Sequence, residues 1–255
     1  MALAWWGGWW QVIHFGAQIL VLALSPSSYR RAQRVVITSS VYLATRPMLP
    51  GFTVLAALVG VVVIRIVLAT SLSYGLSRYA LDVLVRTLVL ELIPLSAALF
   101  VALRYSLAAG EGIRAMRLRG QFEAGLSAGL DPTRDVVLPR ALAGMFAVIT
   151  LALVSSVITL VLAYLSLYGF YSWGLQGFTR TVGQVFNPVI VLIFSLKTLF
   201  FSLAVAIIPM VPTPRQSADV TTRAVGRTHA DLSLLARLLT VILLIEVGSL
   251  VGNYY

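Results

Sequence analysis

Long apolar runs separated by short polar segments dominate the chain. Five of these runs lie at about 51–71, 83–108, 141–168, 188–211 and 233–252. Each holds roughly 20 or more mostly apolar residues, enough to cross a hydrocarbon layer of about 30 Å as an α-helix. Helix is the required conformation, because unpaired backbone groups cannot face lipid and the sequence shows no alternation typical of a β-barrel. The pattern predicts an all-α membrane protein with about five transmembrane helices.

The first apolar run, residues 5–24, differs from the others because its tryptophans cluster at one end. Tryptophan favours the headgroup level of a bilayer, so this run predicts a helix that lies in the interface. A sixth spanning helix is the alternative interpretation. We therefore expect residues 1–50 to form an N-terminal interfacial helix and a cytoplasmic connection. Residues 51–255 are expected to form one five-helix membrane domain.

Composition supports a membrane protein, with 59% hydrophobic and only 11% charged residues. A soluble domain carries about a quarter charged residues. The net charge of +10 comes from arginines in short loops and not from one continuous basic face, which argues against nucleic acid as a partner. The chain has no cysteine, and His14 and His229 lie too far apart in sequence to indicate a metal site.

Loop charge predicts the orientation of the chain. The segments before the first span, after the second and after the fourth are rich in arginine, whereas the opposite side holds little more than Arg78, Arg86 and Arg180. Arginine-rich loops face the cytoplasm. The N-terminus is then cytoplasmic and the C-terminus lies on the far side of the membrane, which agrees with five spans.

The cytoplasmic stretch 111–137 has the pattern of a coupling element. Its apolar residues recur at nearly helical spacing, and Asp131 can cap a helix that starts at Pro132. The stretch predicts a short amphipathic helix that either lies on the membrane surface or docks on a cytoplasmic partner. No P-loop is present in the sequence, so ATP hydrolysis by that route would need a separate subunit. The candidate coupling residues are Arg114, Met116, Arg117, Gln121, Glu123 and Asp131.

Ionisable residues occur inside the predicted spans, where each costs about 2.5–3.5 kcal/mol at a helix centre unless it has a partner or a function. Helical rise places Arg65, Glu91, Lys197 and Glu246 at a similar depth. We expect Lys197 to pair with Glu246 and Arg65 with Glu91, beside a polar-lined lipid path. Purely structural ion pairs are the alternative. Arg104 lies near the cytoplasmic end, where snorkelling to the headgroups is expected.

Two prolines inside the predicted spans, Pro94 and Pro209, are expected to kink their helices, because each removes a backbone donor and crowds the preceding turn. A tolerated membrane proline is the alternative at both positions.

A series of short motifs carries a resemblance that extends over about residues 30–250. The series consists of Glu91-Leu92-Ile93-Pro94, Arg104 with Ala108-Ala109 and Glu111, Met116-Arg117 with Gln121 and Asp131-Pro132, Leu138-Pro139-Arg140 with Ala143-Gly144, Lys197, and Thr221-Thr222-Arg223. In order and spacing the chain resembles the MlaE-type (YrbE-type) permeases of MCE-associated ABC lipid transporters. It departs from the family pattern at Ile93, Leu103 and Gly120, and at the prolines that replace a glycine-rich turn after the fourth span.

The resemblance implies a dimer of this chain with a second copy or a paralogue in the bacterial inner membrane, with the C-terminus in the periplasm. It further implies a P-loop ATPase subunit that binds ATP and Mg²⁺, so that no cofactor belongs to this chain, and an MCE-domain protein on the periplasmic side. The cargo would be phospholipid or a related lipid, moved between inner and outer membranes.

Two other functions compete with a non-catalytic permease subunit. A membrane-embedded lipid-modifying enzyme would need clustered catalytic residues, but the sequence shows no serine–lysine or His–Asp arrangement, no H-E-x-x-H motif and no paired aspartates within a span. A membrane scaffold protein would not depend on an ATPase partner. Copurification with a P-loop ATPase separates the permease from both alternatives.

Overall fold

The computed structural model describes residues 2–29, 31–75, 77–212 and 225–254. Helices make up almost all of these ranges, and no strand forms within them. The longer helices are α1 (Ala2–Leu24), α2 (Arg31–Ser73), α4 (Ile93–Val101), α5 (Leu107–Leu118), α7 (Leu138–Tyr168), α8 (Leu175–Val185), α9 (Pro188–Ile207) and α10 (Val225–Tyr254). The short helical segments are η1 (Pro26–Tyr29), α3 (Ser77–Leu84), η2 (Val85–Leu92), η3 (Ala102–Ser106), α6 (Gln121–Ser127), η4 (Thr133–Val137), η5 (Ser172–Gly174) and η6 (Ile208–Met210).

Five helices in the described ranges are long and apolar enough to cross a membrane, as the hydrophobic pattern predicts. They cover Gln33–Ser73, Tyr79–Leu118, Thr133–Tyr168, Pro188–Met210 and Leu232–Asn253. The first three extend well beyond the apolar runs, because helix continues through polar residues on either side of the hydrocarbon. The predicted domain boundary at residue 50 falls inside α2, so no break in secondary structure marks it.

The described chain divides into two compact units. Unit 1 comprises Met1–Arg46, Val101–Ala147 and Ser202–Leu243, and unit 2 comprises Pro47–Phe100, Val148–Phe201 and Leu244–Tyr255. Every boundary between the units falls inside a helix.

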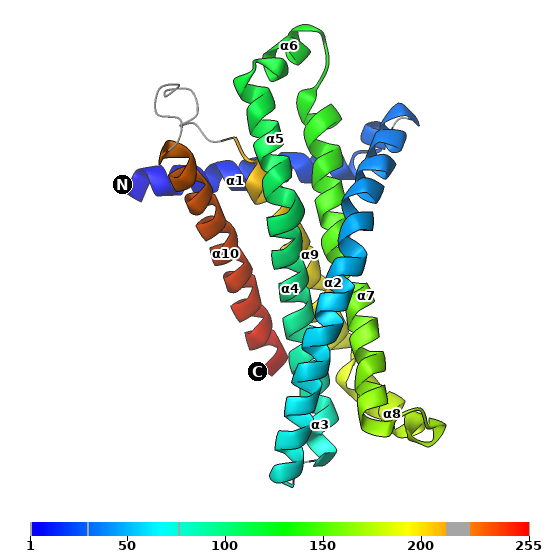
Figure 1. The fold of residues 1–255 in the computed structure, drawn as a ribbon. Helices are drawn as coiled ribbons and strands as arrows, with labels where there is room; N and C mark the ends of the chain where they lie inside the picture. The colour runs from blue at the N-terminus through cyan, green and yellow to red at the C-terminus, as the bar shows by residue number, and fades with distance from the viewer. Residues whose placement is uncertain (1, 30, 76, 213–224, 255) are drawn as a thin grey trace. The chain divides into compact units, whose positions relative to one another are not determined.

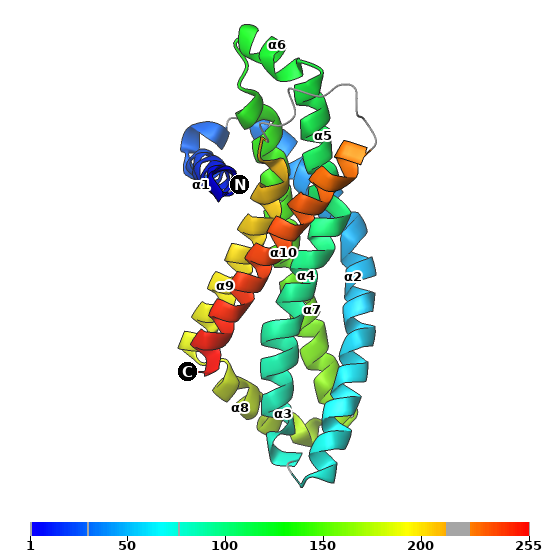
Figure 2. The same ribbon diagram turned by 90° about the vertical axis from the view of Figure 1, so that its left-hand side faces the viewer.

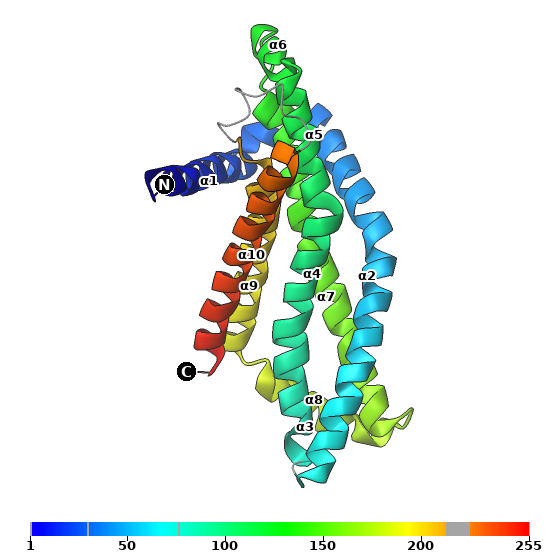
Figure 3. The same cartoon turned by 60° about the vertical axis from the view of Figure 1, so that its left-hand side comes forward.

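In unit 1, α1 packs against α5 and the start of α7. Phe15 and Ile19 of α1 are buried in one apolar cluster with Ile113 of α5 and Leu138 of α7. Figures 1, 2 and 3 show α1 running across α5 and not along it. This arrangement fits the predicted interfacial helix better than a sixth span.

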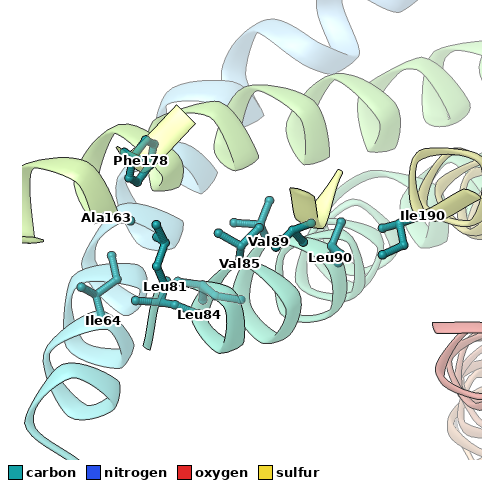
Figure 4. Packing of buried hydrophobic residues seen from close by; sticks show 11 residues of the cluster. Ile64, Leu81, Leu84, Val85, Val89, Leu90, Ala163, Phe178 and Ile190 are labelled. Atoms are coloured by element: carbon teal, nitrogen blue, oxygen red, sulfur yellow. The ribbon is translucent and has the colours of Figure 1, made fainter. Parts of the chain in front are cut away.

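The core of unit 2 joins α2, α3, η2, α7, α8 and α9. Ile64, Leu84, Val85 and Val89 are fully or almost fully buried there, and Phe178 closes the cluster from α8. Figure 4 shows these side chains meeting between the helices. Lipid tails are as apolar as these residues, so close packing, and not exclusion of water, holds this core together.

The two prolines expected to kink their helices behave differently. Pro94 stands in the first turn of α4, directly after the π-helical segment η2, and the chain stays helical through it. Pro209 does not kink α9: the helix ends at Ile207, and Pro209 lies in the 3₁₀ turn η6. The expected kink at Pro209 is therefore wrong, because a proline with no following helical turns ends a helix instead of bending it.

Candidate functional site

Unit 2 contains a buried cluster of charged side chains, the acid–base cluster, formed by Glu91, Lys197, Glu246 and Asn253. Glu91 comes from η2, Lys197 from α9, and Glu246 and Asn253 from α10. Lys197 forms ion pairs with both glutamates, and its Nζ lies 2.8 Å from Glu246 Oε2. Asn253 Nδ2 donates to Glu91 Oε1 at 2.7 Å. The cluster thus joins three helical elements from distant parts of the sequence.

The position of Lys197 follows from the backbone of η2 and α4. Pro94 has no N–H to donate to the Leu90 carbonyl four residues earlier. Lys197 Nζ donates to that carbonyl at 3.3 Å, which satisfies an acceptor that lipid could not. The π-helical segment that contains Leu90 and Glu91 is eight residues long, and such segments are frequent at functional sites. Pro94, the π-helical segment η2 and Lys197 therefore form one local arrangement.

The cluster is shielded from its surroundings. The side chain of Lys197 is 1% exposed, and those of Glu91 and Glu246 are 11% and 12% exposed. The Phe201 ring lies 5.7 Å from Nζ, within range of a cation–π contact. Removal of one partner from a buried ion pair costs about 3–5 kcal/mol, because the other charge remains buried. The stability of the contact between η2, α9 and α10 therefore depends most on Lys197.

The pairing expected from depth is correct for one pair and wrong for the other. Lys197 contacts Glu246, as predicted. Glu91 does not pair with Arg65 but with Lys197. Arg65 follows the buried Ile64 on α2 and is exposed; neighbours on a helix point about 100° apart. The Arg65 side chain therefore points away from the helices against which Ile64 packs. For this reason it does not reach Glu91, although the two residues lie at a similar depth.

A small apolar cavity of about 140 Å³ lies in unit 2 between α2 and the second span. Phe52, Leu55 and Val59 line it from α2, and Leu92 and Ile93 line it from the second span. No side chain of the acid–base cluster lines this cavity, and its apolar walls suit a hydrocarbon chain.

The predicted coupling segment lies in unit 1 and consists of α5, α6 and the turns that flank α6. Gly120 and Gly129 adopt φ of 70° and 75°, a conformation that favours glycine, and they set the two ends of α6. Asp131 Oδ1 accepts from the backbone N–H groups of Thr133, at 3.1 Å, and Arg134, at 3.4 Å. The predicted turn and the Asp131 cap are present, but the predicted helix is interrupted: Gly120 separates α5, with Ile113 and Met116, from α6, with Phe122 and Leu126.

The candidate coupling residues divide into an anchored set and an exposed set. Arg117 is half-buried, with its guanidinium 6.0 Å from the Phe15 ring and 5.0 Å from the Phe122 ring. Met116 Sδ accepts from Arg140 at 3.7 Å. Arg114 is half-buried as well and has a polar or charged contact. Arg117 connects α5 to α1 and α6 through the two rings, and Met116 connects α5 to α7.

The exposed set lies on and after α6. Gln121, Glu123 and Asp131 are exposed, and no described residue of α6 is buried. Leu118 and Leu126 are each 63% exposed, and Leu130 is 59% exposed. A short helix that displays leucines among polar residues and buries none of its own offers a surface to another molecule.

Sequence reasoning missed several residues of both regions. Asn253 and Ser249 belong to the same face of α10 as Glu246, at helical spacings of seven and three residues, and that spacing could have identified them. Phe15 was assigned to the interfacial helix without a role, although its ring contacts Arg117. The π-helical turn at η2 has no sequence signal beyond Pro94.

Five helices in the described residues that are long and apolar enough to cross a membrane, with ion pairs buried between them, define a polytopic α-helical membrane protein. Ionisable groups in a membrane interior commonly have a function. In the described residues, no group of three or more histidine, aspartate or glutamate side chains could hold a metal ion. The model of the permease family MlaE matches residues 37–250, and the chain belongs to this family of ABC-transporter permeases for lipid. No curated protein matches the chain.

Proposed function

We propose that this chain is the non-catalytic membrane subunit of an ABC transporter that moves phospholipid or a related lipid between the inner and outer membranes. A separate P-loop ATPase subunit supplies the energy and binds ATP and Mg²⁺. A second copy or a paralogue of the chain completes the membrane part, and an MCE-domain protein receives or delivers lipid on the periplasmic side. The family, the buried acid–base cluster and the apolar cavity of unit 2 support this function.

The exposed surface of α6 carries the part of the proposal that concerns the ATPase. Glu123 and Leu126 display a charge and an apolar side chain from a helix with no buried residue among those described. Arg117, stacked between aromatic rings, connects this helix to α5 and α1. A force applied at α6 is therefore transmitted to the helices of unit 1 instead of being lost in a loose loop.

The distribution of charge supports the proposed orientation in the bacterial inner membrane. Arginines of the described segments gather in unit 1, whereas unit 2 holds few basic residues. The arginine-rich segments then face the cytoplasm and the ATPase. The N-terminus is cytoplasmic, and the C-terminal end of α10 is periplasmic.

Copurification tests the proposed docking surface. The double variant Glu123→Arg with Leu126→Asp changes two exposed positions of α6, so the fold is expected to persist. We expect about 30-fold less ATPase to copurify with the tagged chain from membranes, because loss of one interface hot spot removes about 2 kcal/mol or more of binding free energy. Lipid mass spectrometry of the wild-type complex should detect bound phospholipid or a related lipid.

A matched control lies on α8, where Arg180 and Leu175 are likewise an exposed charge and an exposed leucine. Arg180→Glu with Leu175→Asp should leave ATPase binding unchanged. If the α6 variant retains the ATPase and normal lipid movement, α6 is not the docking surface. If no ATPase accompanies even the wild-type chain, the ABC-transporter function itself is refuted.

A further inference from the structure

The charges of the acid–base cluster do not balance. One ammonium, that of Lys197, faces two carboxyl groups, those of Glu91 and Glu246. With both carboxyl groups ionised, the cluster would carry a net charge of −1 in a place where the side chains are almost fully buried. An unbalanced buried charge costs several kcal/mol, and a pair of carboxyl groups in one site avoids this cost by keeping one proton.

Two buried oxygens on the face of α10 that carries Glu246 lack a hydrogen-bond donor. Asn253 Nδ2 donates to Glu91, and its buried Oδ1 has no hydrogen-bond partner among the residues that the structure describes. Ser249 is 8% exposed, and its buried Oγ also has no partner. Ser249 follows Glu246 by three residues and Asn253 follows by seven, so all three share one face of α10. Buried acceptors are almost always paired, and a carboxylic acid O–H would supply a donor to this face.

No other charged side chain in the described part of unit 2 supplies the missing positive charge. Arg65 of α2 is exposed and forms no ion pair with a described residue. Arg86 of η2 pairs with Asp82 four residues earlier, at 3.2 Å. Arg180 of α8 is exposed. The segments of α7, α9 and α10 in unit 2 contribute no basic residue except Lys197.

We propose that the acid–base cluster is a proton-binding site that holds one exchangeable proton, shared by the carboxyl groups of Glu91 and Glu246. The proton makes the cluster neutral, and the resulting O–H supplies a donor to the unpartnered oxygens of Ser249 or Asn253. Loss of this proton leaves a net negative charge against Lys197 and weakens the contact between η2, α9 and α10. Protonation of this site therefore controls how firmly these three elements are held together.

Infrared spectroscopy of the full chain in phosphatidylglycerol–phosphatidylethanolamine nanodiscs tests this site. The chain has four glutamates, Glu91, Glu111, Glu123 and Glu246, and two of them, Glu111 and Glu123, are exposed. With carbon-13 glutamate, the C=O stretching band of a protonated carboxyl group is assigned to glutamate without any substitution. We expect a band equivalent to one protonated glutamate at neutral pH in the wild-type chain.

The charge count predicts how the intensity of this band changes in each variant. Glu91→Gln and Glu246→Gln each leave one carboxylate against Lys197, so the band should disappear in both. Lys197→Gln leaves two carboxyl groups without a cation, so the band should double. Glu111→Gln removes an exposed carboxyl group outside the cluster and should leave the band unchanged.

The same spectra give the outcomes that overturn the inference. An absent band in the wild-type chain at neutral pH means that both carboxyl groups are ionised. A band that remains when Glu91 and Glu246 are both replaced by glutamine in one chain belongs to another glutamate. A band that appears only after sodium is replaced by choline shows a bound metal cation in place of the proton. The wild-type measurement decides the question even if a variant fails to fold.

Discussion

Gly110 is the position where the fold of unit 1 is most sensitive to a single added carbon atom. The glycine lies on α5 against the turn η6, and these two elements are in close contact. A Cβ at this position would overlap the carbonyl oxygen of Pro209 and lie 2.9 Å from its carbonyl carbon and 3.1 Å from its Cβ. The obstacle is mostly backbone, which cannot rotate away as a side chain can.

The magnitude of Gly110→Ala follows from this geometry. Ordinary contact needs about 3.4–4 Å, so α5 and η6 must separate by roughly 0.5 Å or more. Overpacking of this kind costs about 1–3 kcal/mol, and a rigid obstacle places the cost near the upper end. Alanine gains about 1 kcal/mol in helix propensity over glycine. The net expectation is a loss of about 1–2 kcal/mol, observed as a fall in the unfolding temperature of the nanodisc-embedded chain.

Gly112 provides the matched control on the same helix. It lies two residues further along α5, is exposed, and has nothing within 4 Å of its ideal Cβ. Gly112→Ala should keep or raise the unfolding temperature, because only the propensity gain remains. If Gly110→Ala is as stable as Gly112→Ala, the close approach of α5 to η6 is absent in the protein, and the reasoning is refuted.

Three further predictions concern the cluster, the cap and the stacked arginine. Lys197→Met should lower the free energy of unfolding in nanodiscs by about 3 kcal/mol, and glutamine at both acidic partners in the same chain should recover most of it; no recovery would contradict the charge argument. Asp131→Ala should cost about 1 kcal/mol in the same unfolding assay, whereas Asp131→Asn keeps an acceptor oxygen and should cost much less. Arg117→Ala should release α1 and speed its cleavage by added protease, whereas alanine at the exposed Arg119 should not; equal cleavage of both variants would exclude a role of the cation–π contact in holding α1.

The apolar pattern is sufficient to predict the class of fold and the number of spans. It does not predict where helices end, because hydropathy reports on the hydrocarbon region and not on helix outside it. The first predicted span starts near residue 51, whereas α2 begins at Arg31 and continues through Pro47 and Pro50. The predicted Asp131 cap was correct because capping depends on neighbouring residues alone.

The site was predictable only as far as depth along a helix determines it. Equal depth indicated a Lys197–Glu246 contact, but depth does not say which face of a helix a side chain occupies, and Arg65 lies on the wrong face. Asn253 was missed because it carries no charge. Gly120 was noted only as a departure from the family motif, and the structure gives its reason: a φ of 70° at the start of α6 favours glycine.

The surroundings of the Lys197 ammonium restrict what can bind there. Three oxygens, from Leu90, Glu91 and Glu246, surround Nζ within 3.3 Å, and an ammonium has three N–H groups. A phosphate group can reach this nitrogen only if one of the three oxygens gives up its place. The ammonium is therefore closed to lipid headgroups in this conformation, and it opens to them only when η2, α9 and α10 move apart.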